Sequence, residues 1–332
     1  MLNSRFEVIK MTEDEKYNYL IQNRFQLDNT ILMAKKKLII DNIKRINNNI
    51  NLSDWLNKNI PMFVAPVSKI HRGRLIVQPT DIGEEIYIDK EFYDNPEKKN
   101  IIIHQLTHEL LHTICRIRKK ENTIATRYFS HDWYDNDGIY LGIDEATTQM
   151  FTDEFENYKL SKEEDPNFYF IKNIMRIMKV IIGEDKLLMQ YLNYNNEFEE
   201  SFNYISNNKF TEFATNINKI YNLMYIISKN KEVSKEASKE IEDLKRAQNI
   251  ILNITQQIIN EQAKKNSNLQ IMLEQEFTDS SFYKDSLNNS SDIIVYKKFM
   301  AVREKALLIY PAIRSKRLNR GDNKNNKEGM IK

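Results

Sequence analysis

Apolar side chains follow two different periods along the N-terminal half of the chain. In residues 17–25 and 31–50, apolar positions recur at mixed spacings of three and four, which predicts helices. From Met62 to Phe92 the pattern changes to short β-rich runs separated by glycine and proline. We therefore expect a helical N-terminal segment, residues 1–60, followed by a small sheet.

Three short runs in this second region have the composition of strands, because β-branched and aromatic residues are frequent in them. The runs are residues 62–65, 74–78 and 85–89, and Pro66, Gly73, Pro79 and Gly83 lie between them. Turn-forming residues at these positions predict a small antiparallel sheet.

An amphipathic helix is expected after the strands. Asp94 or Asn95 is its predicted N-cap, and Pro96 fits the first helical turn. Apolar residues then recur at helical spacing as far as Arg118. These residues are Ile102, Leu106, Leu110, Ile114 and Ile117.

The rest of the chain predicts one irregular stretch and then a largely helical region. Residues 119–143 are polar and irregular, and a second helix is expected from about Asp144 to Tyr158. Helical periodicity then extends from residue 166 to about residue 311. The two clearest stripes are Ile171, Ile174, Met175, Met178 and Ile182, and Ile241, Leu244, Ile251, Ile254 and Ile258. The second stripe favours an ordinary core-facing helix over an exposed arm or a coiled-coil pair.

These elements predict an α+β fold that is mostly α, with a small antiparallel sheet packed on a two-helix core. The expected domains are an N-terminal helical segment (1–60), a core containing the sheet and two helices (61–160) and a helical C-terminal region (161–313). The basic, Asn-rich tail (314–332) is expected to be disordered.

Composition excludes several classes of partner. The 49 basic and 47 acidic side chains give a net charge of +2, so nucleic acid is not expected as a partner. No run approaches the roughly 20 apolar residues that span a bilayer, so no membrane span is expected. Cys115 is the single cysteine, which rules out an intrachain disulfide. The first residues lack the apolar segment of a secretory signal, which predicts a cytoplasmic protein and leaves open export as an effector by another route.

Three of the five histidines lie within nine residues, from His104 to His112. This stretch contains a His-Glu-x-x-His motif, His108-Glu109-x-x-His112, on the first predicted helix. Residues four apart on a helix lie one above the other, so the two imidazoles of the motif can direct nitrogen atoms at one point. Glu109 is rotated about 100° from His108 and can reach a water on a metal bound there. Two neutral nitrogens and an open position suit a catalytic zinc, given one further ligand.

Chance does not explain this motif well. Scattering five histidines and 47 acidic residues at random gives about 0.01 expected occurrences of the spacing. The alternative interpretation is that His108 and His112 are ordinary polar residues on a half-buried helix.

The third ligand is expected downstream of the motif. A metzincin would have a glycine three positions after His112 and a histidine six positions after it, whereas this chain has Cys115 and Arg118. Cys115 fits a small buried side chain better than a ligand, because it lies on the same helix. A carboxylate at the start of the second predicted helix can meet the first helix, and both Asp144 and Glu145 lie there.

The segment Gly142-Ile143-Asp144-Glu145-Ala146 completes a pattern that resembles the gluzincins, the thermolysin-like metallopeptidases. Their signature is His-Glu-x-x-His followed by a Glu on a later helix, often within Asp/Asn-Glu-Ala. The resemblance covers roughly residues 62–160 and implies a zincin-like catalytic core. It implies that the two motif histidines and Glu145 bind one Zn²⁺ and that Glu109 is the general base. Asp144 remains an alternative to Glu145 as the third metal ligand.

One position departs from the gluzincin pattern. Thermolysin has an Asp four residues after the ligand Glu, and this Asp supports the first histidine; the matching residue here is Gln149. A Gln carbonyl can accept the imidazole N–H but brings no charge, so the histidine would be less basic. Asp144 and Asp153 are alternatives for this supporting role.

Four further side chains are candidates for roles near the metal. His104 lies one turn before His108 and fits a supporting or surface position better than a ligand position. The others, His131, Tyr134 and Tyr140, lie in the polar stretch between the two helices and could donate a hydrogen bond to a developing oxyanion.

The resemblance implies a zinc metalloendopeptidase, a hydrolase whose partner is a peptide or protein substrate. In gluzincins the strand beside the motif helix is an exposed edge, so residues 86–88 are expected to bind extended peptide by strand addition. The rival hypothesis is a non-catalytic helical scaffold with a structural or vestigial metal site. The open set of three ligands argues against that rival, because structural zinc sites normally have four protein ligands. A hydrolase of non-peptide amides would use the same residues.

Overall fold

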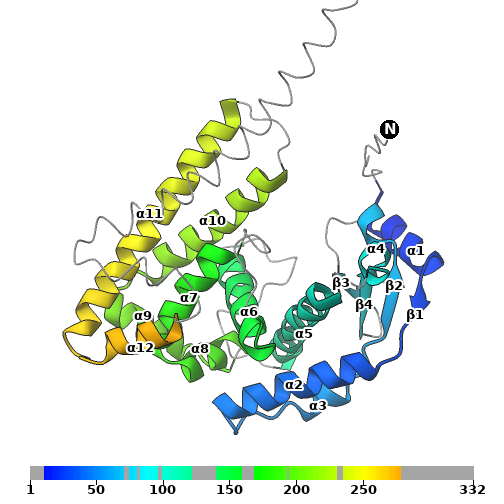
Figure 1. The fold of residues 1–332 in the computed structure, drawn as a ribbon, viewed down its shortest axis with the longest axis horizontal. Helices are drawn as coiled ribbons and strands as arrows, with labels where there is room; N and C mark the ends of the chain where they lie inside the picture. Colours follow the sequence, from blue (N-terminus) through cyan, green and yellow to red (C-terminus); the bar gives the residue numbers. More distant parts are fainter. Residues whose placement is uncertain are drawn as a thin grey trace, which may run out of the picture. The chain divides into compact units, whose positions relative to one another are not determined.

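A computed structural model describes residues 11–70, 75–80, 83–95, 99–121, 140–158, 168–192, 194–229 and 235–277. These residues are mainly helical and contain one four-stranded sheet, so the predicted α+β, mostly α class is confirmed (Figure 1). The chain divides into two compact units, residues 1–204 and 205–332. The predicted domain boundaries at residues 60, 160 and 313 stay predictions, and the tail 314–332 lies outside the described residues.

The first unit begins with three helices and a short strand. They are α1 (Glu13–Gln22), β1 (Phe25–Gln26), α2 (Thr30–Ile46) and α3 (Ser53–Asn57). A capping box between Thr12 and Glu15 starts α1. The prediction of helix as far as Phe25 was wrong at its end, because the backbone leaves the helix at Asn23 and Phe25 pairs with Val64 of the sheet.

The sheet has the strand order β1-β2-β4-β3, with β2 at Met62–Ala65, β3 at Leu75–Thr80 and β4 at Gly83–Asp89. The three predicted runs all form strands, but the purely antiparallel arrangement was wrong. β3 lies at the far edge, and the β3–β4 hairpin returns β4 between β3 and β2, where it runs parallel to β2. The sheet is therefore mixed.

This strand order also corrects the predicted substrate-binding strand. Residues 86–88 belong to β4, which has hydrogen-bonded neighbours on both sides and cannot accept another strand. The edges of the sheet are β1 and β3. Of these two, β3 packs against the helix that carries the histidine motif.

The motif helix α5 (Lys99–Glu121) follows a short helix, α4 (Lys90–Tyr93). Of the two predicted N-caps of the motif helix, Asp94 is instead the C-cap of α4, so that choice was wrong, and Asn95 stays a prediction. α5 packs against α2, β3 and α6 (Leu141–Phe155), the helix predicted to begin near Asp144. Trp55 ties α3 to α5, because its Nε1–H donates to Thr113 Oγ1 over 2.8 Å.

α6 is buried along almost its whole length, with only Leu141, Glu145 and Glu154 less buried. Beside it lies α7 (Tyr169–Ile182), and α8 (Glu184–Tyr191) and α9 (Glu197–Ser206) follow. A central helix with several buried polar side chains needs a partner for each of them, so α6 is where a functional site is most readily built.

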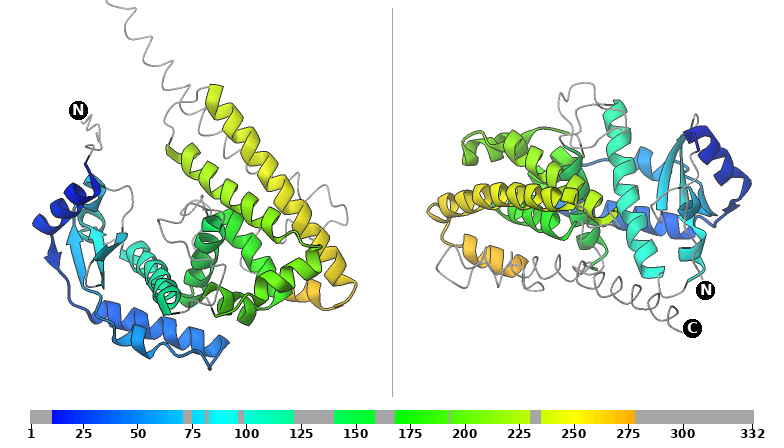
Figure 2. Two further views of the ribbon diagram at one scale, coloured as in Figure 1. Left: turned by 180° about the vertical axis from the view of Figure 1, so that it is seen from behind. Right: turned by 90° about the horizontal axis from the view of Figure 1, so that it is seen from above.

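The second unit contains α10 (Phe210–Lys229), α11 (Lys235–Ala263) and α12 (Leu269–Glu276). α10 and α11 pack side by side (Figure 2). In the predicted stripe of α11, Leu244, Ile251, Ile254 and Ile258 are buried. Among the helices that the structure describes, none has both the length and the apolar character needed to cross a membrane.

Candidate metal site

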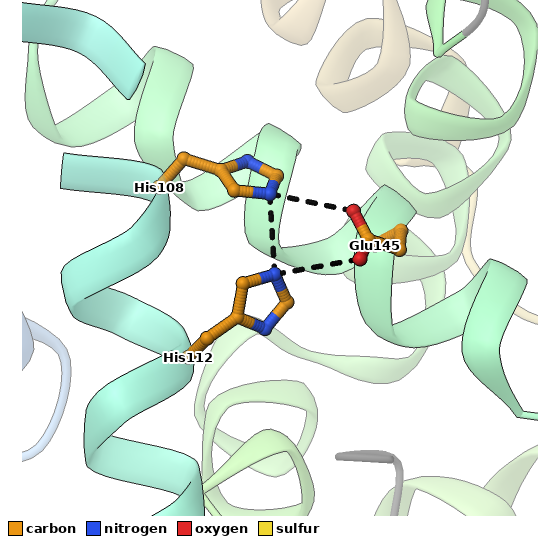
Figure 3. A group of neighbouring side chains, drawn as sticks. All are labelled: His108, His112 and Glu145. Carbon is orange, nitrogen blue, oxygen red and sulfur yellow. Dashed lines mark hydrogen bonds and ion pairs between the residues drawn. The ribbon is translucent and has the colours of Figure 1, made fainter. Parts of the chain in front are cut away.

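His108, His112 and Glu145 form a triangle between α5 and α6 (Figure 3). The Nε2 atoms of the two histidines are 3.1 Å apart. Glu145 Oε2 lies 3.4 Å from His108 Nε2, and Glu145 Oε1 lies 3.6 Å from His112 Nε2. The two histidines come from consecutive turns of α5, and Glu145 lies in the first turns of α6, so helix packing alone brings the three side chains together.

These separations fit one tetrahedral metal ion. Zinc binds imidazole nitrogen and carboxylate oxygen at about 2.0–2.2 Å, which places two ligands of a tetrahedron roughly 3.3–3.6 Å apart. The separations of 3.1, 3.4 and 3.6 Å are each close to this range, although the last two end on different oxygens of Glu145. With one ligand atom taken from each residue, all three atoms lie within 4.8 Å of one another. Among the residues that the structure describes, two nitrogens and one carboxylate are the candidate ligands, which leaves a fourth position for water or substrate. The side chain of Glu145 is 19% exposed to solvent.

The site concentrates negative charge around the histidines. Burial lowers the pKa of His112, but the carboxylates of Asp144, Glu145 and Glu109 outweigh it and raise this pKa to about 9. Burial raises the pKa of Glu145, but the hydrogen bond with His108 and the charge of His112 lower it overall. A divalent cation at this point would take the place of a proton among three carboxylates.

Asp144 supports His112 from the side away from Glu145. Asp144 Oδ2 lies 3.3 Å from His112 Nδ1. A carboxylate only accepts, so His112 carries a proton on Nδ1; without a metal, its raised pKa means that Nε2 is protonated as well, and a metal would replace that second proton. Asp144 is buried, and burial raises its pKa more than His112 lowers it. The alternative of Asp144 as the ligand conflicts with this geometry, because its carboxylate faces Nδ1.

Gln149 lies against the other histidine. Its Oε1 is 3.1 Å from His108 Nδ1, and its Nε2 donates to Asp153 Oδ1 over 2.8 Å. His104 Nε2 lies 2.9 Å from the same Asp153 oxygen, and Lys172 Nζ donates to Asp153 Oδ2 over 2.7 Å. The structure thus brings together Gln149, Asp153 and His104, which the sequence singled out separately.

Glu109 is half-buried on α5, and its charge helps to raise the pKa of His112. Cys115 is buried, and its Sγ–H donates to the backbone carbonyl of Tyr191, so it lies apart from the triangle. Tyr140 is the N-cap of α6, and its backbone carbonyl accepts a hydrogen bond from the backbone N–H of Asp144. Its role in binding an oxyanion stays a prediction, and His131 and Tyr134 lie outside the described residues.

Two residues near the site were not predicted. Lys172 of α7 is buried against Asp153, and the ring of Phe168 lies 6.2 Å from that of His108, in an edge-to-face arrangement. The sequence held a signal for Lys172, because a lysine interrupts the otherwise apolar start of α7. Phe168 gave no signal, since nothing in its sequence context distinguishes it from other aromatic residues.

Comparison of the chain with protein-family models, with curated proteins and with solved structures gives no match. The function must therefore be argued from the geometry of the site.

Proposed function

We propose that this protein is a zinc-dependent metallopeptidase in which His108, His112 and Glu145 bind the metal and Glu109 is the general base. The observation that carries the proposal is the convergence of three candidate ligands: the two Nε2 atoms lie 3.1 Å apart, and one oxygen of the Glu145 carboxylate lies 3.4 Å from His108 Nε2 while the other lies 3.6 Å from His112 Nε2. This set suits zinc with an open position. The support that His112 receives from Asp144 and His108 receives from Gln149 is the arrangement expected around metal-binding histidines.

Zinc held by His108, His112 and Glu145 would polarise a substrate carbonyl and lower the pKa of a water toward about 7. Glu109, one residue after His108 on α5, takes the proton from the attacking water and passes it to the leaving amine. Asp144 against Nδ1 of His112 and Gln149 against Nδ1 of His108 leave both Nε2 atoms facing each other and Glu145.

The corrected sheet suggests where the substrate lies. β3 is an edge strand and packs against α5, the helix that carries both histidines and Glu109. An extended peptide added to its free edge would run beside α5, where its scissile bond can reach the metal. We therefore assign β3, in place of β4, as the strand that pairs with substrate.

Substitution of Glu109 separates catalysis from metal binding. Glu109→Gln keeps the size of the side chain and removes the base, so zinc content should stay at the wild-type level. Cleavage of a mixed peptide library, followed by mass spectrometry, should fall by about a hundredfold or more. Full cleavage activity in this variant would contradict the assignment of the base. Zinc binding without cleavage of any peptide by the wild type would favour a scaffold protein.

A further inference from the structure

The buried polar groups beside His108 form a chain in which each hydrogen bond has a defined direction. Asp153 receives three donors: Lys172 Nζ at 2.7 Å, Gln149 Nε2 at 2.8 Å and His104 Nε2 at 2.9 Å. Burial raises the pKa of Asp153, but the hydrogen bond from His104 and the charge of Lys172 outweigh it and lower the pKa overall. Asp153 is therefore a carboxylate that can only accept.

The direction of the first bond fixes the next. Because Asp153 can only accept, the amide nitrogen of Gln149 points to it, and the amide oxygen must point to His108. That oxygen is also only an acceptor, so His108 carries its proton on Nδ1. Its Nε2, the atom of the metal triangle, is then left with a free lone pair.

We infer that the Asp153–Lys172 ion pair acts through Gln149 to hold His108 in the metal-binding tautomer and orientation. Asp153 and Lys172 are positioning residues, since neither contacts the triangle itself. The inference rests on the proposed metal site. It also explains why a glutamine suits position 149: the side chain must accept from a histidine and donate to a carboxylate, which an aspartate there could not do.

A mutant cycle tests this inference, with zinc affinity measured by competition against a chromophoric chelator. Gln149→Met removes both hydrogen bonds, and zinc affinity should fall about 10- to 100-fold. Asp153→Leu with Lys172→Met replaces the ion pair by apolar side chains of similar shape, a replacement that buried pairs commonly tolerate. Zinc affinity in this double variant should fall by a similar factor. The triple variant should bind zinc no more weakly than Gln149→Met, because Asp153 acts only through Gln149.

A neighbouring ion pair provides the matched control. Lys179 Nζ lies 2.5 Å from Glu154 Oε1 and joins the same two helices, α6 and α7. Glu154→Leu with Lys179→Met therefore removes a comparable contact one residue away and should leave zinc affinity unchanged. Thermal unfolding of each variant, followed by circular dichroism, reports stability separately from zinc affinity.

The outcomes are distinct. Wild-type zinc affinity in the Asp153→Leu, Lys172→Met variant would overturn the inference. So would a triple variant whose loss of zinc affinity equals the sum of the losses in Gln149→Met and in the double variant. Should that double variant fail to fold, Asp153→Asn is the smaller change; it should weaken zinc binding several-fold, because an amide oxygen is a weaker acceptor than a carboxylate. Wild-type affinity in Asp153→Asn would then overturn the inference. Absence of zinc binding in the wild-type protein would instead contradict the metal site itself.

Discussion

Asp144 and His112 face each other across 3.3 Å, with the Asp144 carboxylate against Nδ1 of the ring. The next residue, Glu145, lies against Nε2 of the same ring. Two consecutive carboxylates on α6 thus approach one imidazole at its two nitrogens. One of these carboxylates therefore orients the histidine, and the other is the proposed metal ligand beside it.

Asp144→Asn should weaken zinc binding about 10-fold or more, because an amide supports the histidine without a charge. The measurement is competition against a chromophoric chelator at fixed pH. Asp54→Asn, at an exposed position on α3, is the control and should bind zinc as the wild type does. Unchanged affinity in Asp144→Asn would mean that the charge of Asp144 does not act on the metal site.

Lys36 gives a pH dependence that is separate from the metal. Its Nζ donates to the backbone carbonyls of Trp55 at 3.0 Å and Lys58 at 2.6 Å, at the end of α3. Burial lowers its pKa from 10.5 to about 8, with a smaller contribution from the charge of Lys58. Between these two values the unfolded chain holds more protons than the folded one, so stability should rise with pH over this interval.

Lys36→Met is the reference for this pH prediction, because other groups titrate alike in both proteins. The free energy of unfolding, measured in urea at several pH values, should rise for the wild type relative to Lys36→Met between about pH 8 and 10.5. A difference that is constant across this range would show that Lys36 keeps its ordinary pKa in the folded protein.

Gly183 sits between α7 and α8 at a φ of 119°, a backbone conformation that other residues adopt only with strain. A Cβ built on it meets nothing within 4 Å. Gly183→Ala should therefore cost about 1–3 kcal/mol through the backbone alone. Urea unfolding measures this cost, and zinc affinity should not change. An unchanged stability would show that the turn relaxes to accept a side chain.

Local pattern was enough to predict the strands and the motif helix. The three β-rich runs became β2, β3 and β4, and the spacing of the histidines placed two candidate ligands on one helix face. These features depend on residues a few positions apart, where backbone periodicity decides the structure.

Features that depend on distant contacts were not predicted. The parallel pairing of β2 with β4 depends on the placement of β3 at the far edge of the sheet, so that β4 lies between β3 and β2, and no local pattern encodes this placement. Asp94 is a residue type that is common at N-caps, but it is the C-cap of α4. A polar residue between two helices can end the first or begin the second, so the sequence does not decide between the two. The role of Lys172 could not be inferred from the sequence, because it depends on the packing of α7 beside α6, which places Lys172 against Asp153.

The most direct test of the metal site is the zinc content of the purified protein, measured by elemental mass spectrometry. We expect about one zinc per wild-type chain, and a clear loss in both His112→Ala and Glu145→Ala, since each removes one of three ligands. No zinc in the wild type after controlled reloading, or full zinc retention in both variants, would contradict the account.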